Sequence, residues 1–172
     1  LQTAGDGEYW IKGGTDSPEN FLGYKGFDDT NSGRADYPQW FHDYNEHEKH
    51  WLSTDPNWTD KEGDNGKGII GAINYLSRKG VNSIYVLLQN NGGDVRDVIP
   101  FVGSITIHQN PNANVDGINT NKWYDISKLY QWDIVFSHAQ EKGIALHLLF
   151  GEGETANKTE LDNATLGVER KL

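Results

Sequence analysis

Two stretches of the chain repeat one hydrophobic pattern, and each predicts a helix followed by a strand. In the stretch GKGIIGAINYLSRKG, which covers residues 66–80, Ile69, Ala72, Ile73 and Leu76 recur at helical spacing. Gly80 follows Lys79 where a helix commonly ends in a left-handed residue. The apolar run VNSIYVLL comes directly after this glycine and predicts a buried strand.

The second stretch has the same plan about sixty positions further along the chain. Ser127 is a candidate N-cap for a helix whose apolar residues share one face, namely Leu129, Trp132, Phe136 and Ala139. Lys142 and Gly143 end this helix, and IALHLLF over 144–150 predicts the next strand. The earlier segment EYWIKGG over 8–14 is a candidate first strand.

Helices placed between apolar strands favour an α/β fold with parallel strands. We count three strands with two intervening helices. Long polar connections separate these elements, over residues 23–65 and 90–124, and loops of such length usually carry function.

Composition narrows the class of protein. The 172 residues, 35% of them hydrophobic, can bury one sizeable core. A formal charge of -10 disfavours nucleic acid and anionic membranes as partners. The chain has neither a long apolar span nor a signal-peptide pattern, and it begins at Leu1 with no Met anywhere, which predicts a piece of a longer protein.

Polar residues follow each predicted strand, where parallel α/β folds carry their sites. These candidates for substrate binding are Asp16, Glu19 and Asn20 after the first strand, Asn90, Asn91 and Asp94 after the second, and Glu152 and Glu154 after the third. Carboxylates and amides bind sugar hydroxyls, and aromatic rings stack on pyranose faces. The loops supply Trp40, Trp51, Trp58 and Trp123 for stacking. The alternative is that the Asp and Asn residues form turns and the Trp residues pack the loops.

Other chemistry has weaker support. His42, His47 and His50 lie close together, but HEKH is one residue short of the zinc-protease pattern HExxH. Neither a phosphate-binding glycine loop nor a GxSxG nucleophile turn is present. His138 falls in the second predicted helix, and His147 in the third predicted strand is interpreted as a satisfied sheet or barrel residue rather than a catalyst. We therefore predict no metal and no cofactor.

Several blocks together resemble the beginning of the catalytic domain of large secreted bacterial glycoside-hydrolase-like proteins, in which an immunoglobulin-like domain of unknown function precedes a (β/α)₈ barrel. The blocks are YWIKGGTDSPENFLGYKGFDDT, DPNW, GKGIIGAINYLSRKGVNSIYVLLQNNGGD, DISKLYQWDIVFSHAQEKGIALHLLF and LGVERKL. The resemblance implies that residues 1–172 are the N-terminal portion of one TIM-type (β/α)₈ barrel, incomplete in this chain. It also implies a secreted or periplasmic location and a polysaccharide or oligosaccharide substrate.

By the same resemblance, the acid pair of a glycosidase lies at strands four and seven, beyond Leu172. The chain alone is then expected to be inactive and to supply substrate-binding loops to a polysaccharide-degrading enzyme. Two alternatives stay open. The chain is a carbohydrate-binding module with a tryptophan platform, or a structural subunit whose open sheet edge is completed by the rest of its barrel or by copies of itself.

Overall fold

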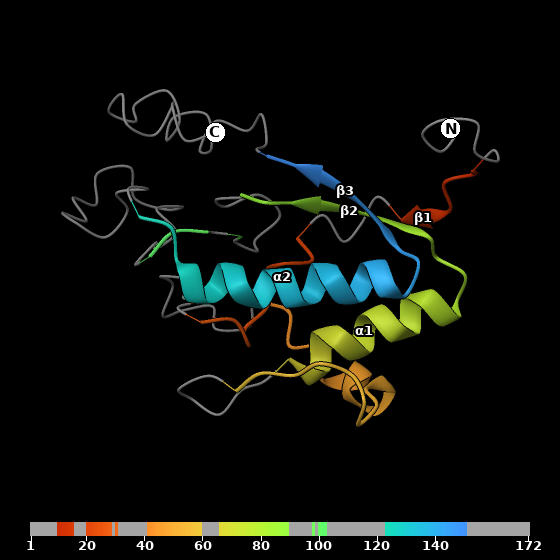
Figure 1. Cartoon of the computed structure of the whole chain (residues 1–172), viewed down its shortest axis with the longest axis horizontal. Coiled ribbons are helices and arrows are strands. Elements are labelled where there is room, and N and C mark those ends of the chain that lie inside the picture. The colour runs from red at the N-terminus through yellow and green to blue at the C-terminus, as the bar shows by residue number, and fades with distance from the viewer. Residues whose placement is uncertain are drawn as a thin grey trace.

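A computed structural model describes residues 10–15, 20–28, 30, 41–59, 66–89, 98, 100–102 and 123–150 of this chain. Helices α1 and α2 lie on one side of a small parallel sheet (Figure 1). The core between these two layers is formed by aliphatic and aromatic side chains of both helices, of the sheet and of residues 21–27. No helix in these ranges is long and apolar enough to cross a membrane.

Helix α1 spans Lys67–Arg78 and strand β2 spans Ser83–Leu87, which confirms the first predicted pair. Ile69, Ile70 and Ile73 of α1 are completely buried. Ile84 and Val86 of β2 are completely buried as well. The chain turns between them at Gly80, whose φ of 78° is a conformation that a residue with a β-carbon rarely adopts. The helix-ending glycine was therefore predicted correctly.

Helix α2 spans Ile126–Glu141 and strand β3 spans Ala145–Leu149, which confirms the second predicted pair. Gly143 ends the helix with a φ of 76°. The predicted N-cap was wrong by two residues, because Asp125 caps the helix and its Oδ1 accepts from the Lys128 N–H at 3.0 Å. The Ser127 hydroxyl instead donates to Asp28 Oδ2.

The strand order is β1-β2-β3, with all neighbours parallel, but only β2 and β3 are full strands. They pair over five residues, from Ser83↔Ala145 to Leu87↔Leu149. Strand β1 is limited to Gly14–Thr15. The prediction of the first three strands of a TIM-type (β/α)₈ barrel is thus wrong for the described residues. They form a two-stranded parallel sheet with a two-residue addition, covered by helices on one face.

Of the predicted first strand over 8–14, residues 10–14 are described, and among these only Gly14 is in a strand. Ile11 is 85% exposed, and Gly13 and Gly14 have no side chains to pack, so this segment buries little apolar surface. Its backbone is held largely by the side chain of Asn82. The Gly13 N–H donates to Asn82 Oδ1 at 2.7 Å, and Asn82 Nδ2 donates to the Ile11 carbonyl at 2.9 Å.

A 3₁₀ helix, η2, spans Asn45–His50 inside what the sequence predicted as a long polar loop. It packs closely on α1 because Gly71 has no β-carbon. An added β-carbon there would overlap the His47 carbonyl oxygen and come within 3.2 Å of the Trp51 nitrogen. The contact between η2 and α1 therefore depends on a glycine inside a helix.

Candidate functional site

Of the eight polar candidates and Trp123, only Asn20 and Trp123 lie within the described ranges. Asn20 is 5% exposed, and its carbonyl accepts from the Gly23 N–H at 2.8 Å in a turn. Trp123 is 74% exposed. The other predicted residues lie outside the described ranges: Asp16, Glu19, Asn90, Asn91, Asp94, Glu152 and Glu154. The expected meeting of carboxylates from three strand ends is thus untested.

The carboxyl end of the sheet nevertheless contains buried polar side chains. Gln89 follows β2, is 4% exposed, and its Nε2 has no hydrogen-bond partner among the described residues. Asp125 is 4% exposed, and its Oδ2 likewise lacks a described partner. Unpaired buried polar atoms are costly. This end of the molecule therefore has hydrogen-bonding capacity that the described residues leave unused.

Exposed apolar residues adjoin the start of α2, and we call them the α2-start patch: Val102, Trp123, Ile126 and Tyr130. The Val102 N–H donates to the Trp123 carbonyl at 3.0 Å, which fixes the two loop residues side by side. Ile126 and Tyr130 are one turn apart on α2 and are 73% and 67% exposed. Behind the patch, Phe101 and Tyr124 stack with ring centroids 4.9 Å apart. The patch thus presents aromatic side chains on a supported backbone.

Two other candidate stacking residues are half-buried and pack against the core. Trp58 lies parallel to Phe27 at 5.6 Å between centroids, and its Nε1 donates to the Gly26 carbonyl. Trp51 donates from Nε1 to the Pro56 carbonyl at 3.0 Å, and the Lys67 ammonium lies 4.9 Å from its ring centroid. Trp40 lies outside the described ranges. Of the four predicted tryptophans, Trp123 is therefore the most exposed among those that the structure describes.

The histidines near η2 form an aromatic cluster. His42 stacks on Tyr44, and His47 and His50 both contact the Tyr75 ring, at 5.0 and 5.3 Å between centroids. Desolvation lowers the pKa of His47 and of His50, with positive neighbours adding to it. In the part of the chain that the structure describes, no group of three His, Cys, Asp or Glu side chains could hold a metal ion.

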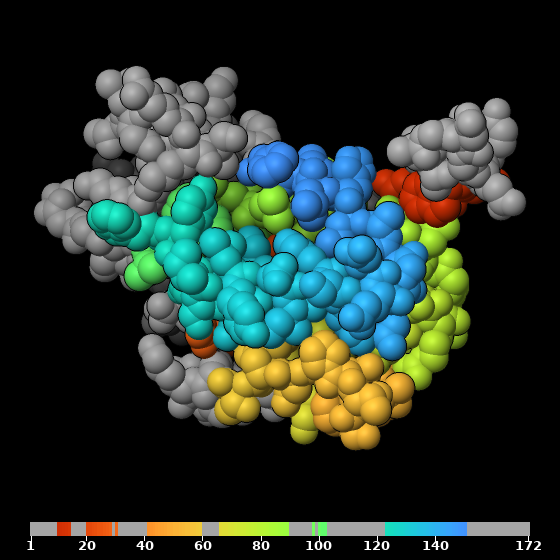
Figure 2. All heavy atoms as spheres, viewed as in Figure 1, coloured from red at the N-terminus to blue at the C-terminus, as the bar shows by residue number. Residues whose placement is uncertain are grey.

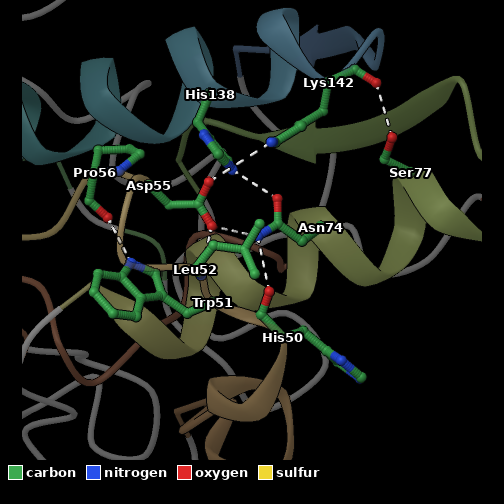
Figure 3. A network of polar contacts seen from close by, with 9 residues as sticks. All are labelled: His50, Trp51, Leu52, Asp55, Pro56, Asn74, Ser77, His138 and Lys142. Atoms are coloured by element: carbon green, nitrogen blue, oxygen red, sulfur yellow. Dashed lines mark hydrogen bonds and ion pairs between the residues drawn. The ribbon is translucent and has the colours of Figure 1, made fainter.

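A group of polar side chains joins η2, α1 and α2 near the C-terminal end of α2, and we call it the Asn74 network (Figure 3). Asn74 Nδ2 donates to the His50 carbonyl at 2.9 Å and to Asp55 Oδ2 at 2.7 Å. Asn74 Oδ1 pairs with His138 Nε2 at 3.0 Å. Lys142 Nζ lies 3.6 Å from Asp55 Oδ1, whose side chain is 5% exposed.

Burial sets the protonation of this network. It lowers the pKa of His138 from 6.5, where Lys142 lowers it further and Asp55 and Glu141 oppose the shift. Burial alone would raise the pKa of Asp55, but hydrogen bonds from the Leu52 N–H and from Asn74 outweigh it and hold that pKa below 3.8. The network is therefore a neutral imidazole and an amide beside a carboxylate that is paired with Lys142. Because the network is buried between helices, we infer that it stabilises the fold.

The histidine predicts an acid-sensitive fold. Below about pH 6.5 the unfolded chain takes up a proton that folded His138 resists, so the free energy of unfolding falls with pH by up to about 1.4 kcal/mol per unit. Asp55 lowers the free energy of unfolding further at more acidic pH. Its contribution to stability is present above pH 3.8 and disappears as the pH falls through the pKa of the folded state. Urea unfolding between pH 7.5 and 5 measures the first effect.

His138→Gln should flatten this dependence, because glutamine keeps an amide donor for Asn74 and does not titrate. Gln140→Ala, a change at an exposed residue of the same helix that does not titrate, is the matched control and should leave the slope unchanged. A wild-type stability that is flat or rises on acidification would contradict the assignment.

Comparison with known proteins yields no relative. No protein-family model, no curated protein and no solved structure matches this chain.

Proposed function

We propose that this chain binds polysaccharide at the α2-start patch and serves as a binding part of a secreted carbohydrate-degrading protein. The single observation that carries the proposal is the exposure of two aromatic side chains, Trp123 at 74% and Tyr130 at 67%, on one supported surface. Contiguous exposed apolar patches on a protein surface mark sites of interaction. Trp51 and Trp58 are less exposed than Trp123.

The chemistry of this patch suits a sugar. A tryptophan or tyrosine ring presents a flat apolar face that packs on the C–H face of a pyranose, while the tyrosine hydroxyl can donate to or accept from a sugar hydroxyl. The resemblance described above supports the same class of ligand. Hydrolysis is not part of this proposal, because the resemblance places the acid pair outside this chain.

Trp123→Ala is expected to weaken binding about tenfold, or about 1.4 kcal/mol, because stacking and apolar burial on one indole are lost together. Affinity electrophoresis in gels containing xylan, mixed-linkage β-glucan or laminarin measures the retardation. Leu52→Ala is the matched control, because Leu52 is an exposed apolar residue, 51% accessible, that follows η2 rather than the patch.

Wild-type protein should be retarded by at least one of these polysaccharides, and the Leu52 variant should behave like it. Circular dichroism confirms that both variants stay folded. If none of the polysaccharides retards the wild type, or if Trp123→Ala is retarded equally, the α2-start patch is not a sugar site.

A further inference from the structure

Strand β3 lies at the edge of the described sheet and lacks the features that normally protect such an edge. No described strand pairs with it on the side away from β2 (Figure 1). Edge strands usually carry charges, prolines or bulges that prevent pairing with another chain. The run IALHLLF over 144–150 has no Asp, Glu, Lys, Arg or Pro, in a chain of net charge -10. Leu148 and Phe150 are 37% and 66% exposed.

The direction of the backbone groups follows from two hydrogen bonds to the β2 side. The Ala145 N–H donates to the Asn82 carbonyl, and the Leu149 carbonyl accepts from the Leu88 N–H, both at 2.8 Å. Successive residues of a strand alternate the side to which their N–H and C=O groups point. Leu146 and Leu148 therefore direct these groups outward, away from β2, where another strand could pair with them.

The sequence of β3 is nearly symmetric about its central residue. Leu146 and Leu148 flank His147, and Ala145 and Leu149 lie one position further out. An antiparallel pair of identical strands around a twofold axis at His147 would bring Leu146 of one copy opposite Leu148 of the other. Both residues have outward backbone groups, so each such pair would exchange two hydrogen bonds.

We propose that β3 is a self-association edge, at which two copies of this chain pair their β3 strands antiparallel around a twofold axis at His147. The two sheets then become one continuous sheet. A twofold interface uses the same surface on both copies, which is why the near-symmetric pattern favours a second copy over an unrelated strand. The edge lies apart from the α2-start patch, so this inference is independent of sugar binding.

The neighbours of His147 fit this arrangement. The Lys12 ammonium lies 3.3 Å from His147 Nδ1, and Tyr85 on β2 meets the imidazole edge-on at 5.2 Å between centroids. Both contacts lie to the β2 side of His147 and leave the outer edge of β3 accessible. The net charge of -10 on each copy opposes association over a longer range, and dissolved salt screens that repulsion.

Sedimentation equilibrium from micromolar to near-millimolar protein tests the proposal. The wild-type mass should rise from 19.3 kDa towards twice that value, and the dimer share should increase with added NaCl. Leu148→Pro removes one outward N–H from each copy, which an edge strand tolerates within its own sheet, and should keep the protein monomeric. If proline impairs folding, Leu148→Lys serves as the second variant, and it should also be monomeric.

Leu52→Lys is the matched control, because it adds the same charge at an apolar residue that is 51% exposed and lies outside both β3 and the α2-start patch, and it should dimerise like the wild type. A wild type that stays monomeric at every concentration and salt level overturns the proposal. A dimer that persists in a folded Leu148 variant overturns it too, as does growth to open oligomers, which a closed twofold pair does not form.

Discussion

Replacing Asn74 with alanine is expected to lower the free energy of unfolding by about 3 kcal/mol, because it leaves several buried polar groups without partners. Asn74 is 5% exposed and bonds to His50, Asp55 and His138 on three different segments (Figure 3). In the variant, His138 Nε2 and the His50 carbonyl lose these bonds within a closely packed interface. Urea unfolding near pH 7.5 measures the loss.

Asn45→Ala is the matched control, since Asn45 is an exposed asparagine whose amide bonds only locally, to Asp43. Its effect should stay within about 0.5 kcal/mol. If Asn74→Ala costs no more than this control, the network does not join η2, α1 and α2 as described.

Gly71→Ala is expected to destabilise the protein by about 2 kcal/mol, although alanine is normally favoured over glycine within a helix by about 1 kcal/mol. The reversal arises because the added methyl group would overlap the His47 carbonyl oxygen and force η2 away from α1. Backbone atoms at both ends of the contact leave little room for adjustment. Thermal and urea unfolding of the variant measure the effect.

A pair of substitutions at Gln140, an exposed position on α2, supplies the reference for this prediction. Gln140→Ala should be about 1 kcal/mol more stable than Gln140→Gly. The account is contradicted if alanine at position 71 stabilises the protein as it does at position 140.

Periodicity located the two helix–strand pairs because their apolar residues face a single core. Ile69, Ile73 and Val135 are at most 1% exposed, and the glycines after both helices have the left-handed backbone expected of them. Such local signals depend on neighbours a few residues apart. The extent of β1 could not be read this way, because its backbone is held by Asn82, about seventy positions away.

Long-range polar contacts account for most of what the sequence did not predict. The hydrogen-bond partner of His138, Asn74, lies 64 residues earlier on α1, and Asp55, which bonds to Asn74, lies earlier still. One signal was present in Asn74 itself, a polar residue among buried neighbours of an apolar helix. Of the predicted binding residues, Trp123 is exposed, whereas the exposed Tyr130 was not among them, because a helical tyrosine gives no sign of its exposure in the sequence.

Helix α2 connects the Asn74 network with the α2-start patch. Near the C-terminal end of α2, His138 and Lys142 belong to the Asn74 network (Figure 3). At the other end, Ile126 and Tyr130 of the helix and Trp123 of the preceding loop are exposed. Helix α2 also forms a large part of the molecular face seen in Figure 2. We infer that the network holds the helix in place while its opposite end is left accessible to a ligand.

Sugar binding at Trp123 is the central claim, and the indole N–H signals of the six tryptophans test it directly by NMR during titration with an oligosaccharide of the retarding polysaccharide. The Trp123 signal should shift in a saturable way while the signals of Trp51 and Trp58, whose indole N–H groups donate to backbone carbonyls, stay in place. An unmoved Trp123 signal, or equal shifts at all three, would contradict it.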